Sequence, residues 1–138
     1  MPAFLRLAAA ALIGALPAQS AHPQAWPVKP LRIVVPLAPG GGNDTMARLV
    51  GAKLAGSLGQ QVVVDNRPGG GSAIASELVA RAPADGHTLY LVSTSFTAAP
   101  SLVRSLPYDT LRDFAPITLL AVVPAALVVH ASLPVKSA

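Results

Sequence analysis

The chain of 138 residues contains no cysteine, which excludes a disulfide scaffold, a cysteine-ligated metal site and a thiol nucleophile. Its three histidines, His22, His87 and His130, are too scattered to suggest a ligand cluster. Glu77 is the only glutamate, and no two acidic residues have a spacing that suggests acid–base catalysis. No serine lies in a Gly-x-Ser-x-Gly elbow. We therefore expect no enzyme activity, no metal ion and no cofactor.

Charged residues are also few, at 12% of the chain, whereas hydrophobic residues make up 52%. This balance is typical of a folded chain with an apolar core and not of a disordered one. Ten Lys and Arg residues against six Asp and Glu residues give a net charge of +4. The basic residues stand singly, without interleaved aromatic residues, so no nucleic acid partner is expected.

Residues 1–20 show the three zones of a secretory signal peptide. The positive charge of Arg6 precedes an apolar run over 7–18, and Ser20 is the second of two small residues at the cleavage-determining positions. Pro17 closes the run well short of the roughly 20 apolar residues that a membrane span needs. We therefore expect export, with removal of this leader near Ser20.

Strand-like and helical segments alternate along the rest of the chain. Continuous β-branched runs predict strands, and apolar residues at steps of three and four predict helices. The expected strands are 31–35, 61–65 and 88–92, and the expected helices are 45–58 and 72–82. The later apolar stretch, divided by Pro124, is interpreted as two buried strands, 115–122 and 126–130, rather than a membrane span. This order predicts an α/β fold, a three-layer sandwich with a mainly parallel sheet and helices on both faces.

Each expected helix has local signals for its ends and its buried face. Asn43 or Asp44 is expected to cap the first helix, and Gly59 to end it. The expected apolar faces are Met46, Leu49, Val50, Leu54 and Leu58 in the first helix and Ile74, Leu78 and Ala82 in the second. His87 follows a turn and is expected at the surface.

Two glycine-rich turns, 39–44 and 68–72, each follow a strand and precede a helix. Both are expected at the carboxyl edge of the same sheet, where binding crevices form. Glycine allows close approach of backbone N–H groups, and a helix start adds unpaired donors, so the expected guest is a small anion. No Lys-Ser/Thr pair follows either turn, and Thr45 and Ile74 replace the third glycine of the dinucleotide pattern. The alternative is that these glycines only permit a tight turn.

Other polar residues near these turns have two interpretations each. Asp44 either meets a ligand amino group or, as we favour, caps the helix. The run from Ser93 to Ser95 either donates to a carboxylate or is an ordinary strand end. Asn66 and Arg67 either reach an anion or lie along the surface.

Six short motifs occur in order after the leader: 26–36, 39–44, 65–69, 84–89, 106–109 and 113–116. Together they resemble the substrate-binding receptors of tripartite tricarboxylate transporters, also called Bug proteins. The resemblance implies a periplasmic binding protein of type II, in which two α/β lobes close on a small carboxylate or dicarboxylate. It also implies that membrane permease subunits receive this ligand.

The resemblance places the first-lobe ligand contacts on both glycine turns and at the end of the third strand. It implies that the ligand-binding residues are Gly40, Gly41, Gly42, Asn43, Gly69, Gly70, Gly71, Ser72, Ser93 and Thr94. Asn43 stands where Thr or Ser is frequent, Ser72 where a further Gly is usual, and Ala99 where Asn is common. These departures are expected to shift the choice of ligand.

The sequence ends at Ala138, where the proteins it resembles continue into a second lobe. We therefore expect residues 21–138 to be the first lobe of a truncated solute-binding protein whose second lobe is missing. One alternative is a nucleotide- or phosphate-binding enzyme domain, which the absent P-loop lysine and the absent acidic residue after the second strand disfavour. The other is a non-binding remnant produced by truncation.

Overall fold

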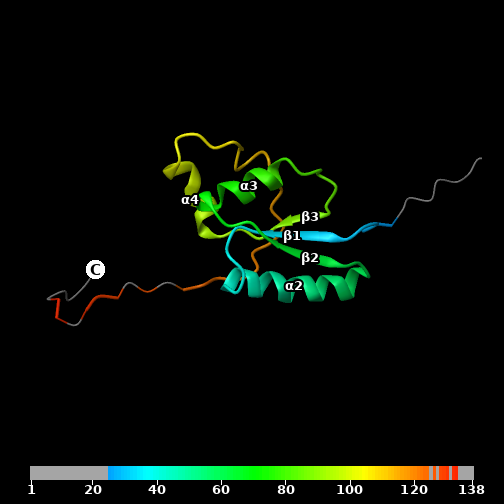
Figure 1. Cartoon of the computed structure of the whole chain (residues 1–138), viewed down its shortest axis with the longest axis horizontal. Helices are drawn as coiled ribbons and strands as arrows, with labels where there is room; N and C mark the ends of the chain where they lie inside the picture. Colours follow the sequence, from blue (N-terminus) through cyan, green and yellow to red (C-terminus); the bar gives the residue numbers. More distant parts are fainter. Residues whose placement is uncertain (1–24, 125, 127, 131, 134–138) are drawn as a thin grey trace, which may run out of the picture.

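A computed structural model describes residues 25–124, 126, 128–130 and 132–133, so the predicted leader at 1–20 lies outside the described residues. Three parallel strands form a sheet in the order β2-β1-β3 (Figure 1). They are β1 (Leu31–Val35), β2 (Val62–Asn66) and β3 (Thr88–Tyr90). In the register, Ile33 of β1 lies opposite Val64 on one side and Leu89 on the other. The predicted parallel α/β sheet is confirmed.

Helices cover both faces of this sheet, as predicted. Helix α2 (Gly42–Leu58) packs on β1 and β2, and α3 (Ala73–Ala80) packs on β1 and β3 from the other side (Figure 1). Helix α4 (Thr94–Leu102) lies beside α3 and contacts the short helix η1 (Gly70–Ser72). Parallel neighbours need crossover connections, and such connections place a helix on a face of the sheet.

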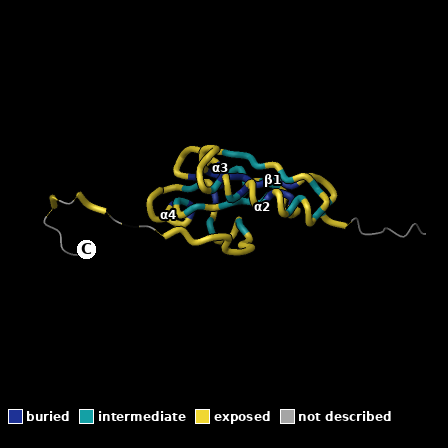
Figure 2. Tube along the Cα trace, turned by 90° about the horizontal axis from the view of Figure 1, so that it is seen from below, coloured by how far each residue is buried: buried dark blue, intermediate teal, exposed yellow. Residues whose placement is uncertain are grey.

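The core follows from the central position of β1. Both faces of β1 are covered, and four of its five residues are apolar: Leu31, Val34 and Val35 are almost completely buried (Figure 2). Ile33, Val35 and Ala47 form a cluster, against which lie Val62, Val64, Leu89 and Leu91. The edge strands β2 and β3 are only half-buried.

Small residues, and not the predicted leucine stripe, form the innermost face of α2. Ala47 and Gly51 are buried, whereas Leu49 is 61% exposed and the other predicted apolar positions are half-buried. A Cβ atom on Gly51 would stand 3.3 Å from Cγ1 of Val62. The helix therefore approaches the sheet closely because these side chains are small. Gly59, with φ of 65°, ends the helix as predicted by donating its N–H to Ala55.

The amino end of α2 differs from the prediction. The helix starts at Gly42 after an N-cap residue, Gly41, which has no side chain to offer. Asp44 lies inside the first turn and accepts the N–H of Gly40, which precedes the helix, so the predicted N-cap role of Asn43 or Asp44 is wrong.

Helix α3 is shorter than predicted, ending at Ala80, and a different face is buried. Ala75 and Ser76 are buried, while Ile74 is 53% exposed. The hydroxyl of Ser76 donates to the carbonyl of Ser72, so a polar residue is accommodated on the inner face. The predicted face of Ile74, Leu78 and Ala82 is therefore wrong.

Helix α4 was not predicted, because its hydroxyl-rich start and Pro100 are untypical of a helix. The helix forms because its inner face is buried, with Phe96 and Ala99 in the core. The Phe96 ring lies 5.0 Å from that of Phe114 and 6.1 Å from that of Tyr108, centroid to centroid. Tertiary packing of the aromatic cluster therefore outweighs weak local propensity.

Two further predictions are wrong. None of the described residues within 115–122 and 126–130 lies in a strand, and Ile117 and Val123 are 79% and 86% exposed. A strand needs a hydrogen-bonded neighbour as well as apolar composition, and none of the three described strands pairs with this segment. His87 is buried instead of exposed, because the Trp26 ring packs edge-on against it at 5.8 Å.

Among the residues described, no helix is both long enough and apolar enough to cross a membrane.

Candidate ligand-binding site

Three turns meet at the carboxyl edge of the sheet, one after each strand. The turns after β1 and β2 are the two glycine-rich turns, and the turn after β3 is the hydroxyl run that starts α4. Since α2 lies below the sheet and α3 and α4 above it (Figure 1), the chain leaves β1 and β3 toward opposite faces. In open parallel sheets, ligands typically bind outside the strand ends at the point where neighbouring connections diverge in this way.

The first turn presents backbone donors. Thr45 makes the first helical hydrogen bond, from its N–H to Gly41 at 3.0 Å. Within the described part of the chain, the N–H groups of Gly41, Gly42 and Asn43 have no hydrogen-bond acceptor. The N–H of Gly40 differs, because it donates to Asp44. Unpaired amides at the positive end of α2 attract a negative group.

Asp44 carries the negative charge nearest this turn, and that charge is compensated. Its side chain is buried, with Oδ2 at 2.9 Å from the nitrogen of Gly40 and Oδ1 at 3.0 Å from Nη2 of Arg48. Hydrogen bonds from Arg48 and then Gly40 hold the pKa of Asp44 below its ordinary value. The carboxylate therefore fixes the turn, and it does not face a ligand as a free charge.

Four successive residues of the second turn have positive φ: Gly69 (122°), Gly70 (57°), Gly71 (60°) and Ser72 (81°). L-residues rarely adopt these values, so the glycines are required here. Ser72 donates its N–H to Gly69 at 3.1 Å, while among the described residues the N–H groups of the three glycines have no acceptor. Successive free amides in such a turn form a concave anion-binding nest.

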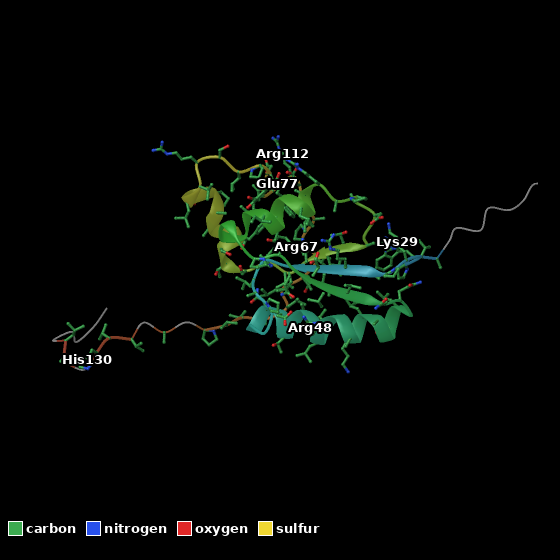
Figure 3. All side chains as sticks on the ribbon, in the orientation of Figure 1. Lys29, Arg48, Arg67, Glu77, Arg112 and His130 are labelled. Carbon is green, nitrogen blue, oxygen red and sulfur yellow. The ribbon has the colours of Figure 1, made fainter. Side chains whose placement is uncertain are left out.

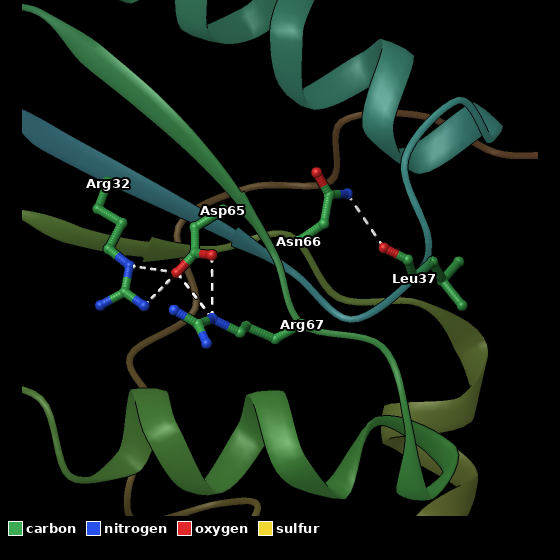
Figure 4. Close-up of polar contacts among 5 residues, drawn as sticks. All are labelled: Arg32, Leu37, Asp65, Asn66 and Arg67. Atoms are coloured by element: carbon green, nitrogen blue, oxygen red, sulfur yellow. Dashed lines mark hydrogen bonds and ion pairs between the residues drawn. The ribbon is translucent and has the colours of Figure 1, made fainter.

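Arg67 and Asn66, beside the second turn, make contacts within the protein (Figure 4). Nε of Arg67 lies 3.0 Å from Oδ1 of Asp65, whose Oδ2 also binds Arg32. Burial alone would raise the pKa of Asp65, but the two guanidinium groups lower it. Nδ2 of Asn66 donates to the carbonyl of Leu37 at 3.0 Å, which ties the second turn to the first.

The basic side chains near the turns are therefore paired. Figure 3 shows Arg48 and Arg67 toward the carboxyl edge of the sheet, and Lys29 at the opposite end. Arg48 binds Asp44, Arg67 binds Asp65, and Lys29 binds Asp85 at 2.7 Å. An anion at the turns would thus meet neutral donors more than free cations.

The third turn supplies hydroxyl groups. Oγ of Ser95 lies 2.6 Å from Oγ of Ser72 and 2.7 Å from Oγ of Ser93. The structure thus joins two predicted site residues from different turns through Ser95, which was not among them. The run of three hydroxyl residues was the sequence signal that pointed to it. Thr94 lies between Ser93 and Ser95 in the sequence, at the exposed start of α4.

All ten predicted site residues therefore lie on the turns after the three strands. A separate open hollow of about 600 Å³ is lined by Thr97, Pro100, Leu106, Tyr108, Asp109, Thr110 and Leu111. It contains none of the ten, and its lining is mainly apolar. Within the described ranges, no three His, Asp or Glu side chains gather in a way that could hold a metal ion.

Residues 46–138 match the model of the tripartite tricarboxylate transporter family receptor. The chain, whose three parallel strands form a sheet with helices on both faces, belongs to this family. It is 48% identical over 107 residues to a protein encoded in the tcbD-tcbE intergenic region of Pseudomonas sp. strain P51, covering 78% of this chain and 32% of that protein. The chain thus spans about a third of the length of such curated relatives.

Solved structures show the same fold. The periplasmic binding protein BugD superimposes with a TM-score of 0.64 at 39% identity, over 67% of this chain and 31% of that chain. MatC from Rhodopseudomonas palustris, solved with bound malate, gives 0.65 at 42% identity over 69% and 33%. Rpa4515 of R. palustris, solved with adipate, gives 0.58 at 41% identity over 62% and 29%.

Proposed function

We propose that this chain forms the first lobe of an extracytoplasmic solute-binding protein, which captures a small organic carboxylate for a tripartite tricarboxylate-type transporter. One observation carries the proposal: of the three turns at one sheet edge, the first two hold backbone amides that have no acceptor among the described residues, and the third supplies hydroxyl groups, while the nearby acidic side chains are already paired. Two of the structural neighbours were solved with dicarboxylates, malate and adipate, which supports this class of ligand.

The proposed contacts differ in kind among the ten site residues. Amide donation to the carboxylate is assigned to the first and second turns, at Gly41, Gly42, Asn43, Gly69, Gly70 and Gly71. Hydroxyl contacts with the ligand are assigned to Ser72, Ser93 and Thr94. Gly40, whose N–H is engaged by Asp44, shapes the first turn with its φ of 85° and does not donate to the ligand.

The cellular setting is also part of the proposal. Residues 1–20 are assigned to a cleaved signal peptide, and residues 21–138 to the exported lobe in the periplasm. The membrane permease subunits of the transporter are the proposed partners, and the protein itself performs binding rather than catalysis. Its membership of a receptor family and its periplasmic neighbour BugD support this assignment.

Titration calorimetry of the purified chain with malate, adipate and the matching neutral diamides tests the proposal. The donors lie on an open surface, where ionic contacts are weak, so we expect binding of the dicarboxylates in the millimolar range. The diamides present N–H groups and carry no charge, so they should not bind measurably. Equal affinity for acid and diamide, or no binding of either acid, would contradict the proposal.

A further inference from the structure

Ser95 is the central member of a chain of hydroxyl groups that links two turns of the candidate site. It contacts Ser72 at the start of α3 and Ser93 at the start of α4, at 2.6 Å and 2.7 Å between oxygen atoms. Ser72 is buried, and Ser95 is half-buried. Ser72 is also the only described residue other than glycine with positive φ. This chain of hydroxyl groups therefore contacts a turn whose backbone has an unusual conformation.

A second chain of hydroxyl groups, formed by Tyr90 and Ser76, binds the carbonyl of Ser72. The direction of hydrogen-bond donation along it follows from counting protons. The carbonyl of Ser72 can only accept, so the hydroxyl of Ser76 donates to it at 2.9 Å. Since Ser76 has one hydroxyl proton, its contact with Tyr90 at 2.9 Å is a donation from the phenol. Ser72 is therefore held through its carbonyl from one side and through its hydroxyl from the other.

The same count of protons applies to the hydroxyl groups of Ser72, Ser95 and Ser93. Ser72, Ser95 and Ser93 together have three hydroxyl protons, and the two contacts between them use two. One hydroxyl proton is left for a further acceptor. Ser95, as the middle member, holds its two neighbours at a fixed separation, whichever of the three hydroxyls carries that free proton. The two contacts within the cluster therefore leave one hydroxyl proton that can be donated to an anion.

We propose that Ser95 is a positioning residue of the carboxylate site, which holds the hydroxyls of Ser72 and Ser93 in register so that one free proton is presented to a ligand carboxylate. This inference rests on the proposed function. The observation behind it is the continuous contact of three hydroxyls from two separate turns, beside amides for which no acceptor is found in the described part of the chain. A serine that only joined α3 to α4 would give stability and leave affinity unchanged.

The test uses the full chain and three variants: Ser95→Ala, Ser95→Thr and the control Ser101→Ala. Ser101 is exposed on the same helix. Dissociation constants for malate come from NMR titration, which follows weak binding, and stability comes from urea denaturation. We expect Ser95→Ala to weaken malate binding about tenfold, as for one lost hydrogen bond to a charged group. Ser95→Thr keeps the hydroxyl and should bind within about twofold of the unchanged chain.

The outcomes separate this inference from the function it depends on. If malate binds and Ser95→Ala binds it equally well, the positioning role is wrong while the proposed function stands. The same holds if alanine and threonine are equally defective, because the hydroxyl is then not what matters, or if the Ser101→Ala control loses as much affinity. If the unchanged chain does not bind malate, both the proposed function and this inference are overturned.

Discussion

The carboxylate of Asp44 accepts the backbone N–H of Gly40, four residues earlier, at 2.9 Å. This contact folds the first glycine turn back onto the helix that follows it. It also removes one amide from the set available to a ligand, and the negative charge of Asp44 is paired with Arg48. Asp44 thus stabilises the first glycine turn, although it is acidic, and the other amides of that turn remain available to a ligand.

Asp44→Asn should lower stability at neutral pH, and the loss should disappear in acid. Arg48 and Gly40 lower the pKa of Asp44 in the folded chain, relative to an unfolded value of about 3.9. The carboxylate therefore stabilises the fold above that unfolded pKa, and this contribution is lost as the pH falls through the folded pKa. Thermal melts of both proteins from neutral to acidic pH test this, and a constant difference between them would contradict it.

Gly41→Ala should weaken carboxylate binding while leaving the fold intact. Gly41 has φ of −83°, and an added Cβ would meet nothing nearer than the Ala38 carbonyl at 3.7 Å. The methyl group would nevertheless obstruct approach to the amides of the first turn. We expect about a tenfold loss of malate affinity by titration. Unchanged affinity with unchanged stability would show that this turn has only a structural role.

Gly70→Ala should reduce both affinity and stability, because Gly70 has φ of +57°. A side chain in this conformation costs about 1–2 kcal/mol. Gly59→Ala is the matched control, since Gly59 has φ of +65°, open space around it and a place at the far end of α2. Urea denaturation should show similar losses for both, and only Gly70→Ala should lose malate binding. Equal binding by both variants would remove the second turn from the site.

Two glycines within α2 should respond oppositely to substitution. Gly56 has nothing within 4 Å of an added Cβ, so Gly56→Ala should stabilise the chain by about 1 kcal/mol through helix propensity. Gly51→Val should destabilise it by about 1–3 kcal/mol, because the added atoms overlap Val62. Urea denaturation measures both, and a neutral Gly51→Val would show that α2 does not pack as closely as described.

The exposed apolar segment after Phe114 should cause self-association. Leu119 and Val123 are 77% and 86% exposed, and contiguous exposed apolar surface promotes association. Leu119→Lys with Val123→Lys should lower the apparent mass in sedimentation at high protein concentration. The control Leu111→Lys alters a leucine that is 89% exposed and lies outside this segment, and it should not change the apparent mass. A strictly monomeric unchanged chain would contradict this expectation.

The central strand and the two glycine turns could be predicted because local sequence determines them. The apolar run of β1 and the glycines that need positive φ leave few other conformations. Helix α4 could not be predicted, since its hydroxyl residues and Pro100 do not favour a helix. What stabilises it is the packing of Phe96 against aromatic rings that are far away in the sequence but close in the fold. The strands expected near Val122 failed for a related reason, since a strand depends on a partner that sequence composition does not reveal.

The site was predictable in position and less so in detail. Strand order brings the three turns together, and the glycines mark two of them. Which amides are already engaged depends on single side-chain contacts, such as Asp44 with Gly40 and Asn66 with Leu37. The role of Ser95 depends on the meeting of two turns that lie 23 residues apart in the sequence.

The most direct test of the central claim, that the three turns form one carboxylate site, is a residue-resolved NMR titration with malate. We expect the amide resonances of Gly41–Asn43, Gly69–Gly71 and Ser93–Ser95 to shift together along one binding curve. Resonances around the hollow lined by Leu106 and Tyr108 should not move. Shifts centred on that hollow, or separate curves for the three turns, would contradict the account.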